Sequence, residues 1–233
     1  MGAIFLHFLK PITALILTVG IFLGFVSCKD YYASVADGQP IIILDAGHGG
    51  EDCGAIGVNG IYEKDINLQI ATLIGEELAA RGFTVLQTRT EDKLLYTEAE
   101  NIKGIRKISD LKNRVKIFNS YESAVVVSIH MNSFSASKYS GLQVYYSHTE
   151  GSLGLATEIK ESVKESLQPE NKRNVKLGDG IYVLKHSEHP SVLVECGFLS
   201  NPEECELLSK KEYQKSLSFS IVCGIINYVE KSQ

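Results

Sequence analysis

The sequence lacks the cysteine patterns that build a zinc–thiolate site or a disulfide framework. Its five cysteines form no CxxC pair, and their odd number leaves at least one unpaired. We therefore expect free or buried thiols. The chain also lacks a basic run of the kind that follows a phosphate backbone, and its formal net charge is -5. Nucleic acid is not an expected partner.

The length gives no reason to expect a second large domain. A chain of 233 residues with 44% hydrophobic content has enough material for one α/β domain with a sizeable core. We place this domain at residues 40–233.

The N-terminal segment contains a long stretch without charge, residues 11–28, which continues an apolar start. Such a run indicates export, either with a cleaved signal peptide or with a retained membrane anchor. Cys28 adds lipoprotein processing as a third alternative, although the leucine usually found three positions earlier is missing. We assign residues 1–28 to a signal peptide or membrane anchor and residues 29–39 to a linker.

The remaining chain alternates apolar runs with amphipathic stretches, which predicts an α/β fold with a mainly parallel sheet. Strands are expected at 41–44, 83–88, 124–129, 141–147, 181–184 and 191–194, and helices at 63–81, 110–121, 155–167 and 212–230. The polar segment 91–109 is too long for an ordinary connection. It is either a functional, mobile flap or a tolerated surface insertion.

Metal-capable side chains follow the ends of two of these strands. His48 lies in a glycine-rich loop after the strand 41–44, and Glu63 begins the next helix. An imidazole and a carboxylate suit zinc, although a helix-start glutamate is also favoured by the helix dipole alone. His130 follows the strand 124–129, and ligands in open α/β sheets gather outside the carboxyl ends of strands. Two histidines together with Glu63 favour a metal site.

Glu195 ends another apolar strand, where a carboxylate is costly unless it is hydrogen-bonded or lies near a cation. His186 and His189 lie three residues apart in a polar loop beside Pro190, and we expect them to be solvated rather than metal ligands.

Four stretches, DAGHGGEDCGA, YEKD, SIHMN and SVLVECGFLSN, together resemble the zinc-dependent N-acetylmuramoyl-L-alanine amidases of type 3. The resemblance runs from about residue 40 to residue 230. It implies that His48, Glu63 and His130 bind one Zn²⁺ and that Glu195 is the catalytic carboxylate. It also implies a three-layer α/β fold with a mixed, mostly parallel six-stranded sheet flanked by helices.

The tracts NIKGIRKISDLKNRVKIFN and HPSVLVECGFLSNPEE look most like the spore-germination subgroup, which prepares the spore cortex for muramic-lactam formation. The resemblance implies hydrolysis of the amide between N-acetylmuramic acid and L-alanine in peptidoglycan. It also implies an exported or membrane-anchored enzyme in the forespore or cortex space. The alternatives are a zinc peptidase acting on the stem peptide, a vegetative cell-wall amidase, and a wall-associated scaffold with a degenerate site. The presence of all four site residues argues against the scaffold.

The segment 91–109 is also where we expect glycan or an accessory protein to bind. It mixes charges of both signs with few large apolar side chains. Leu94, Leu95 and Tyr96 are the candidate contact cluster, since exposed apolar groups beside charges often mark interaction sites. The alternative is that these three side chains pack on the domain.

Overall fold

The computed structural model describes residues 39–232. The predicted signal peptide or anchor at 1–28, including Cys28, and nearly all of the predicted linker lie outside the described residues. Within 39–232 no helix is both long and apolar enough to cross a membrane. The cysteines in this part of the chain are all free: Cys53, Cys196, Cys205 and Cys223.

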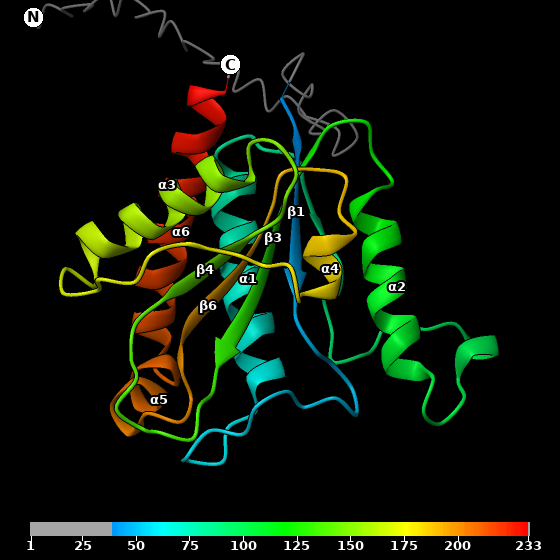
Figure 1. The fold of residues 1–233 in the computed structure, drawn as a ribbon, viewed down its shortest axis with the longest axis horizontal. Coiled ribbons are helices and arrows are strands. Elements are labelled where there is room, and N and C mark those ends of the chain that lie inside the picture. Colours follow the sequence, from blue (N-terminus) through cyan, green and yellow to red (C-terminus); the bar gives the residue numbers. More distant parts are fainter. Residues whose placement is uncertain (1–38, 233) are drawn as a thin grey trace, which may run out of the picture. The chain divides into compact units, whose positions relative to one another are not determined.

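The centre of the domain is a mixed sheet whose six strands follow the order β2-β1-β3-β6-β4-β5 (Figure 1). The strands are β1 (Ile41–Ala46), β2 (Val85–Gln87), β3 (Ala124–Asn132), β4 (Gln143–Tyr146), β5 (Lys176–Leu177) and β6 (Ser191–Phe198). β1, β2, β3 and β6 pair in parallel, whereas β4 runs antiparallel to β6 and pairs in parallel with β5. The predicted mostly parallel six-stranded sheet is confirmed.

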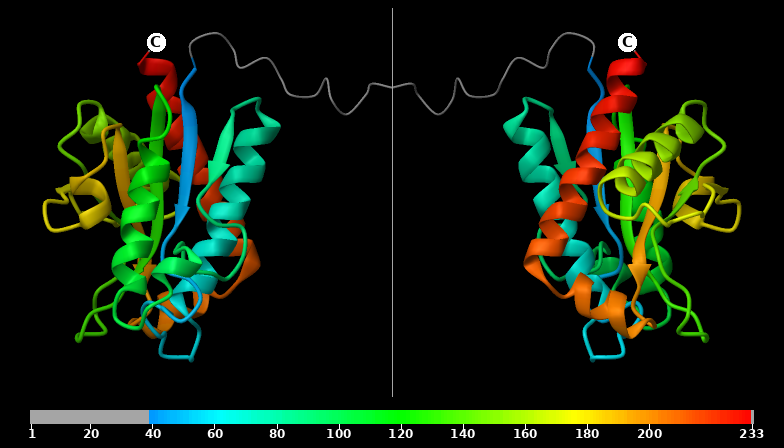
Figure 2. Two further views of the ribbon diagram at one scale, coloured as in Figure 1. Left: turned by 90° about the vertical axis from the view of Figure 1, so that its right-hand side faces the viewer. Right: turned by 90° about the vertical axis from the view of Figure 1, so that its left-hand side faces the viewer.

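Helices cover both faces of the sheet and make three layers (Figure 2). One face carries α1 (Glu63–Ala80), α3 (Ser152–Ser166) and α6 (Lys211–Lys231), and the other carries α2 (Arg106–Phe118) and α4 (Tyr182–Lys185). The larger apolar core lies under α1, α3 and α6, and the smaller one under α2 and α4. The predicted three-layer architecture is therefore confirmed.

An apolar stripe on α1 accounts for the place of this helix in the larger core. Ile66, Ile70, Ile74 and Leu78 recur at helical spacing and are fully buried. The helix ends just before Gly82, whose φ of +87° supplies the left-handed residue that commonly closes a helix. This packing fixes Glu63, the first residue of α1, against the sheet.

The predicted strand at 181–184 is wrong, because Tyr182–Lys185 form the short helix α4. Val183 and Leu184 are successive residues and both are buried, which a strand with one covered face would not allow. A four-residue apolar run does not distinguish a strand from a buried helical turn. Neither β5 nor α5 (Pro202–Leu208) was predicted from the sequence. The Asn201 side chain caps the first turn of α5.

The segment 91–109 is more structured than predicted. It contains the 3₁₀ turn η1 (Glu98–Glu100), and its last four residues begin α2. Leu94 is only 8% exposed, so it is not part of an exposed cluster. The Leu95 N–H donates to Asp110 Oδ1 at 2.7 Å, which ties this stretch to α2. The large apolar side chains that the segment does expose are Ile102, Ile105 and Ile108.

Candidate metal centre

The structure brings the three predicted ligands together at the carboxyl ends of β1 and β3. His48 Nε2 lies 3.2 Å from Glu63 Oε1, and His130 Nδ1 lies 3.0 Å from the same oxygen. One ring nitrogen of each histidine and one carboxylate oxygen of Glu63 all lie within 4.8 Å of one another. Two imidazoles and one carboxylate form a donor set that catalytic zinc uses, with a fourth position left for water or substrate. The residues therefore fit a zinc ion.

Two glycines allow the ligands to approach so closely. A Cβ on Gly47 would lie 2.1 Å from His130 Nε2, and a Cβ on Gly54 would lie 2.5 Å from Glu63 Oε2. His48 itself has a φ of +61°, a left-handed conformation that costs free energy for a residue other than glycine. The surrounding contacts must hold His48 in this conformation.

Asp52 orients the His48 ring. Asp52 Oδ2 lies 2.9 Å from His48 Nδ1, which leaves Nε2 facing Glu63. Lys107 of α2 pairs with the same carboxylate oxygen at 3.1 Å. Burial lowers the pKa of His48, but the Asp52 and Glu63 carboxylates outweigh burial and raise the pKa to about 9. A carboxylate on the outer nitrogen of a histidine is the usual support for a metal ligand.

The Glu63 carboxylate is ionised. Burial raises its pKa, but hydrogen bonds and the positive charge of His130 and His48 outweigh burial and hold the pKa well below its usual range. The Met131 N–H also donates to Glu63 Oε1 at 3.0 Å. Glu63 is therefore available as an anionic ligand.

Arg114 of α2 holds the His48 loop through hydrogen bonds to its backbone. Its Nη2 donates to the His48 carbonyl at 2.8 Å, and its Nη1 donates to the Ala46 carbonyl at 2.9 Å. The guanidinium also forms ion pairs with Asp45 and with Asp110, and all three side chains are buried. The strained turn at His48 is thus tied to α2.

Asp45 completes this buried network. It accepts hydrogen bonds from Thr88 Oγ1 at 2.7 Å and from Ser128 Oγ at 2.6 Å. Burial raises the pKa of Asp45, but the Arg114 charge and the two hydroxyl donors outweigh it and hold the pKa below its usual range. The sequence reasoning assigned no role to Arg114 or Asp52. The available signals were an arginine on the apolar face of the helix 110–121 and an acid four residues after His48.

Glu195 lies opposite His130 in the register of β6 with β3. Its Oε2 atom is buried and has no hydrogen-bond partner among residues 39–232. Burial raises the pKa of Glu195 to about 7; Glu63 adds to this rise, and the two histidine ligands oppose it. A cavity of about 280 Å³ opens beside the ligands, between α2 and α4. Among its lining residues are His48, His130 and Tyr182.

His186 and His189 are not part of this centre. In the described part of the chain, the group of side chains that fits a metal is His48, Glu63 and His130. His186 is exposed, and its Nδ1 lies 2.8 Å from the Tyr182 carbonyl.

These features define an α/β enzyme with a candidate metal centre at the carboxyl edge of its sheet. The family model for N-acetylmuramoyl-L-alanine amidase matches residues 42–227, so the chain belongs to this family. It is accordingly a peptidoglycan amidase.

Relatives cover most of the chain. A germination-specific N-acetylmuramoyl-L-alanine amidase of Bacillus subtilis is 38% identical over 189 residues, which span 81% of this chain and 79% of the relative. The CwlD amidase of Clostridioides difficile, solved in complex with the GerS lipoprotein, is 41% identical with a TM-score of 0.79, covering 83% of this chain and 100% of that one. An N-acetylmuramoyl-L-alanine amidase of Clostridium difficile 630 is 29% identical with a TM-score of 0.74, covering 84% and 99%.

Proposed function

We propose that this enzyme hydrolyses the amide between N-acetylmuramic acid and L-alanine in the spore cortex and uses a zinc ion held by His48, Glu63 and His130. The observation that carries the proposal is the convergence of these three side chains beside Glu195. A zinc ion in such a site supplies polarisation of the amide carbonyl and a nucleophile at neutral pH.

The protein's own residues perform the proton transfers and hold the geometry. Glu195 accepts a proton from the attacking water and then donates it to the leaving amine. A pKa raised to about 7 suits both steps near neutral pH. Asp52 and Arg114 keep His48 in its metal-facing orientation.

Product analysis tests the reaction. Purified cortex peptidoglycan and vegetative peptidoglycan are digested with the protein, with and without added zinc, and the products are analysed by mass spectrometry. New N-terminal L-alanine that appears only with zinc, and faster from cortex, is the expected result. A different new amine would identify a stem-peptide peptidase, and equal rates on both walls would favour a vegetative amidase.

The spore role is supported by the similarity to the germination-specific relative. We also propose that the N-terminal segment 1–28 exports the enzyme and that it acts at the membrane or in the forespore or cortex space. Fractionation of sporulating cells tests this location, and full activity in the cytoplasmic fraction would refute it.

The segment 91–109 is our proposed contact for an accessory protein, since a similar amidase was solved in complex with a lipoprotein. Ile105 and Ile108 are exposed there, and neighbouring Lys107 pairs with Asp52. A lipoprotein of that type from the same organism is titrated against the wild type, Ile105→Ser and the control Ile56→Ser, which changes an isoleucine outside the segment that is 58% exposed. Weaker binding of Ile105→Ser alone is expected, and equal binding by all three would place the contact elsewhere.

A further inference from the structure

An aromatic cluster lies at the carboxyl ends of β3 and β6, where Phe198 ends β6 and Phe134 and Tyr139 follow β3. We call Phe134, Tyr139 and Phe198 the aromatic platform. The Phe134 and Tyr139 rings pack edge to face with centroids 5.1 Å apart, and the Tyr139 and Phe198 centroids are 6.2 Å apart. Phe134 is 54% exposed, and Tyr139 is 37% exposed. Two large aromatic side chains therefore face solvent at the end of the two strands that carry His130 and Glu195.

Arg173 lies on this platform. Its guanidinium carbon is 4.8 Å from the Phe198 centroid and 5.9 Å from the Tyr139 centroid. Its Nε donates to the Ser140 carbonyl at 3.0 Å, which fixes the direction of the side chain. Among residues 39–232, neither Nη atom of Arg173 has a hydrogen-bond or ion-pair partner. The guanidinium is thus held in place with its outer nitrogens free.

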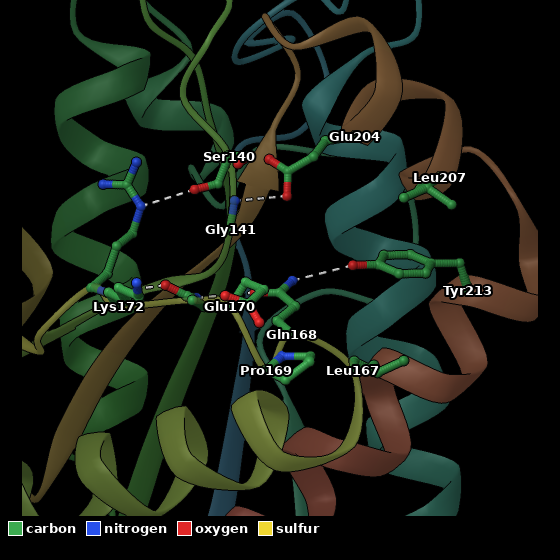
Figure 3. Close-up of a pocket in the computed structure, with 12 residues that line it drawn as sticks. Ser140, Gly141, Leu167, Gln168, Pro169, Glu170, Lys172, Glu204, Leu207 and Tyr213 are labelled. Carbon is green, nitrogen blue, oxygen red and sulfur yellow. Dashed lines mark hydrogen bonds between the residues drawn. The ribbon is translucent and has the colours of Figure 1, made fainter.

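The neighbouring acid does not serve as a partner for Arg173. The two Glu204 oxygens accept from the Gly141 N–H at 2.8 Å and the Phe198 N–H at 2.7 Å. Figure 3 shows Glu204 and Gly141 in this contact at the wall of a cavity of about 620 Å³, which Arg173 also lines. Both Glu204 oxygens accept from the backbone, so Arg173 lines this cavity without an ion pair to Glu204.

A bulge in β6 lies between Glu195 and the platform. Glu195 pairs with His130 and Phe198 pairs with Asn132, so β6 has one more residue than β3 over this stretch. Bulges often redirect a side chain beside an active site. Gln143 of β4 pairs with Glu195 in the sheet, and its Nε2 donates to the Asn174 carbonyl at 2.7 Å. The residue that follows Arg173 therefore contacts the cross-strand partner of Glu195.

We propose that Arg173, positioned by the aromatic platform, binds a carboxylate of the peptide stem of the substrate beside Glu195. The inference rests on the proposed amide hydrolysis, because it assigns a subsite to that reaction. The planar guanidinium matches a carboxylate with two parallel hydrogen bonds. Stacking and the Ser140 contact already restrict the side chain, so little further order is lost on binding.

The kinetic test compares two muramoyl-peptide substrates that differ in one group, a free or an amidated carboxylate on the second residue of the stem. Arg173→Met keeps much of the packing on the rings and removes the charge. We expect KM to rise roughly tenfold for the free acid with little change in kcat, and no change for the amide. Arg173→Lys keeps the positive charge but lacks the paired N–H donors of the guanidinium, so its KM for the free acid is expected to lie between those of the wild type and Arg173→Met.

The matched control is Arg81→Met. Arg81 also lies over an aromatic ring, with its guanidinium carbon 5.6 Å from the Phe219 centroid, but it belongs to the end of α1. Equal losses on both substrates, no loss on either, or the same loss in Arg81→Met would overturn the inference. Stacking of glycan on the platform would appear as a loss that does not depend on the carboxylate.

A binding measurement separates this inference from the proposed function. Calorimetry of the zinc-loaded Glu195→Gln protein with both muramoyl-peptides needs no hydrolysis. Tighter binding of the free acid that Arg173→Met abolishes is the expected result. If the wild type hydrolyses neither substrate, the proposed function fails, and the calorimetry still decides whether Arg173 binds the carboxylate.

Discussion

Replacing Arg114 by methionine removes the guanidinium that connects α2 to the loop of His48. Methionine retains an unbranched side chain that can fill the space of the arginine stem. The change leaves Asp45 buried without its cation and leaves the His48 carbonyl without its donor. We expect both the folded state and the metal site to suffer.

The magnitude follows from the burial of the pair. Breaking a buried ion pair on one side costs about 3–5 kcal/mol, because an uncompensated charge remains in the interior. For a domain of this size, such a loss lowers Tm by about 6–20 °C. Asp110 also loses its partner, so the upper half of the range is expected. Thermal unfolding followed by circular dichroism, together with zinc titration by a competing chelator, measures both effects.

The loss of stability in Arg114→Met should depend on pH. In the wild type, the lowered pKa of Asp45 stabilises the fold above the ordinary aspartate pKa of about 4. That stabilisation is lost as pH falls through the lower folded value. Without Arg114, burial dominates and raises the folded pKa above the unfolded one. The destabilisation is then greatest at neutral pH and lessens as pH falls, so the two Tm curves converge toward acid.

A double variant provides the decisive comparison. Asp45→Asn removes the charge that Arg114→Met leaves unpaired, so the double variant should unfold at a higher temperature than the sum of the single effects implies. Strict additivity of the two changes in the free energy of unfolding would refute the reasoning. So would a loss of less than about 1 kcal/mol in Arg114→Met, because a loss that small is typical of an exposed salt bridge.

Three further outcomes are expected. Glu195→Gln should retain its zinc and its melting temperature but lose activity by about 10²- to 10⁴-fold, as measured by release of N-terminal alanine; wild-type turnover would exclude Glu195 as the base. His130→Ala should contain no zinc by metal analysis, whereas His186→Ala should keep one equivalent, and the reverse would show that the ligands are misassigned. Because the pKa of His48 is raised to about 9, zinc uptake at pH 7 should release about one proton, and apparent affinity should fall as pH drops below 9. Calorimetry in buffers of different ionisation enthalpy counts that proton, and a count of zero would contradict the assignment.

The positions of the three candidate ligands could be predicted because each follows a recognisable local signal. His130 comes directly after the apolar run 124–129, His48 follows the run 41–44 after three intervening residues, and Glu63 begins a helix with an apolar stripe. Parallel strands then place these ends at one edge of the sheet. The fold class and the candidate ligands therefore depend on patterns that are short-range in sequence.

The support of the centre could not be predicted in this way. Arg114 reaches the His48 carbonyl across 66 residues, and nothing in the local pattern of α2 says which loop its guanidinium meets. The predicted strand at 181–184 was wrong for a different reason, because a run of four residues is too short to show a helical or strand periodicity. The sequence around Leu94, Leu95 and Tyr96 is compatible both with an exposed contact cluster and with packing on the domain, and the structure buries Leu94.

The contacts of Asp45 have a consequence for how the protein becomes competent to bind metal. Its partners Thr88, Arg114 and Ser128 are separated from it by 43, 69 and 83 residues. Pairings over such distances form slowly, because the chain must close long loops before any contact offsets the lost entropy. Under the proposed function, tight zinc uptake would therefore be a late event that reports the completed sheet, and a partly folded chain would hold zinc poorly until its centre had closed.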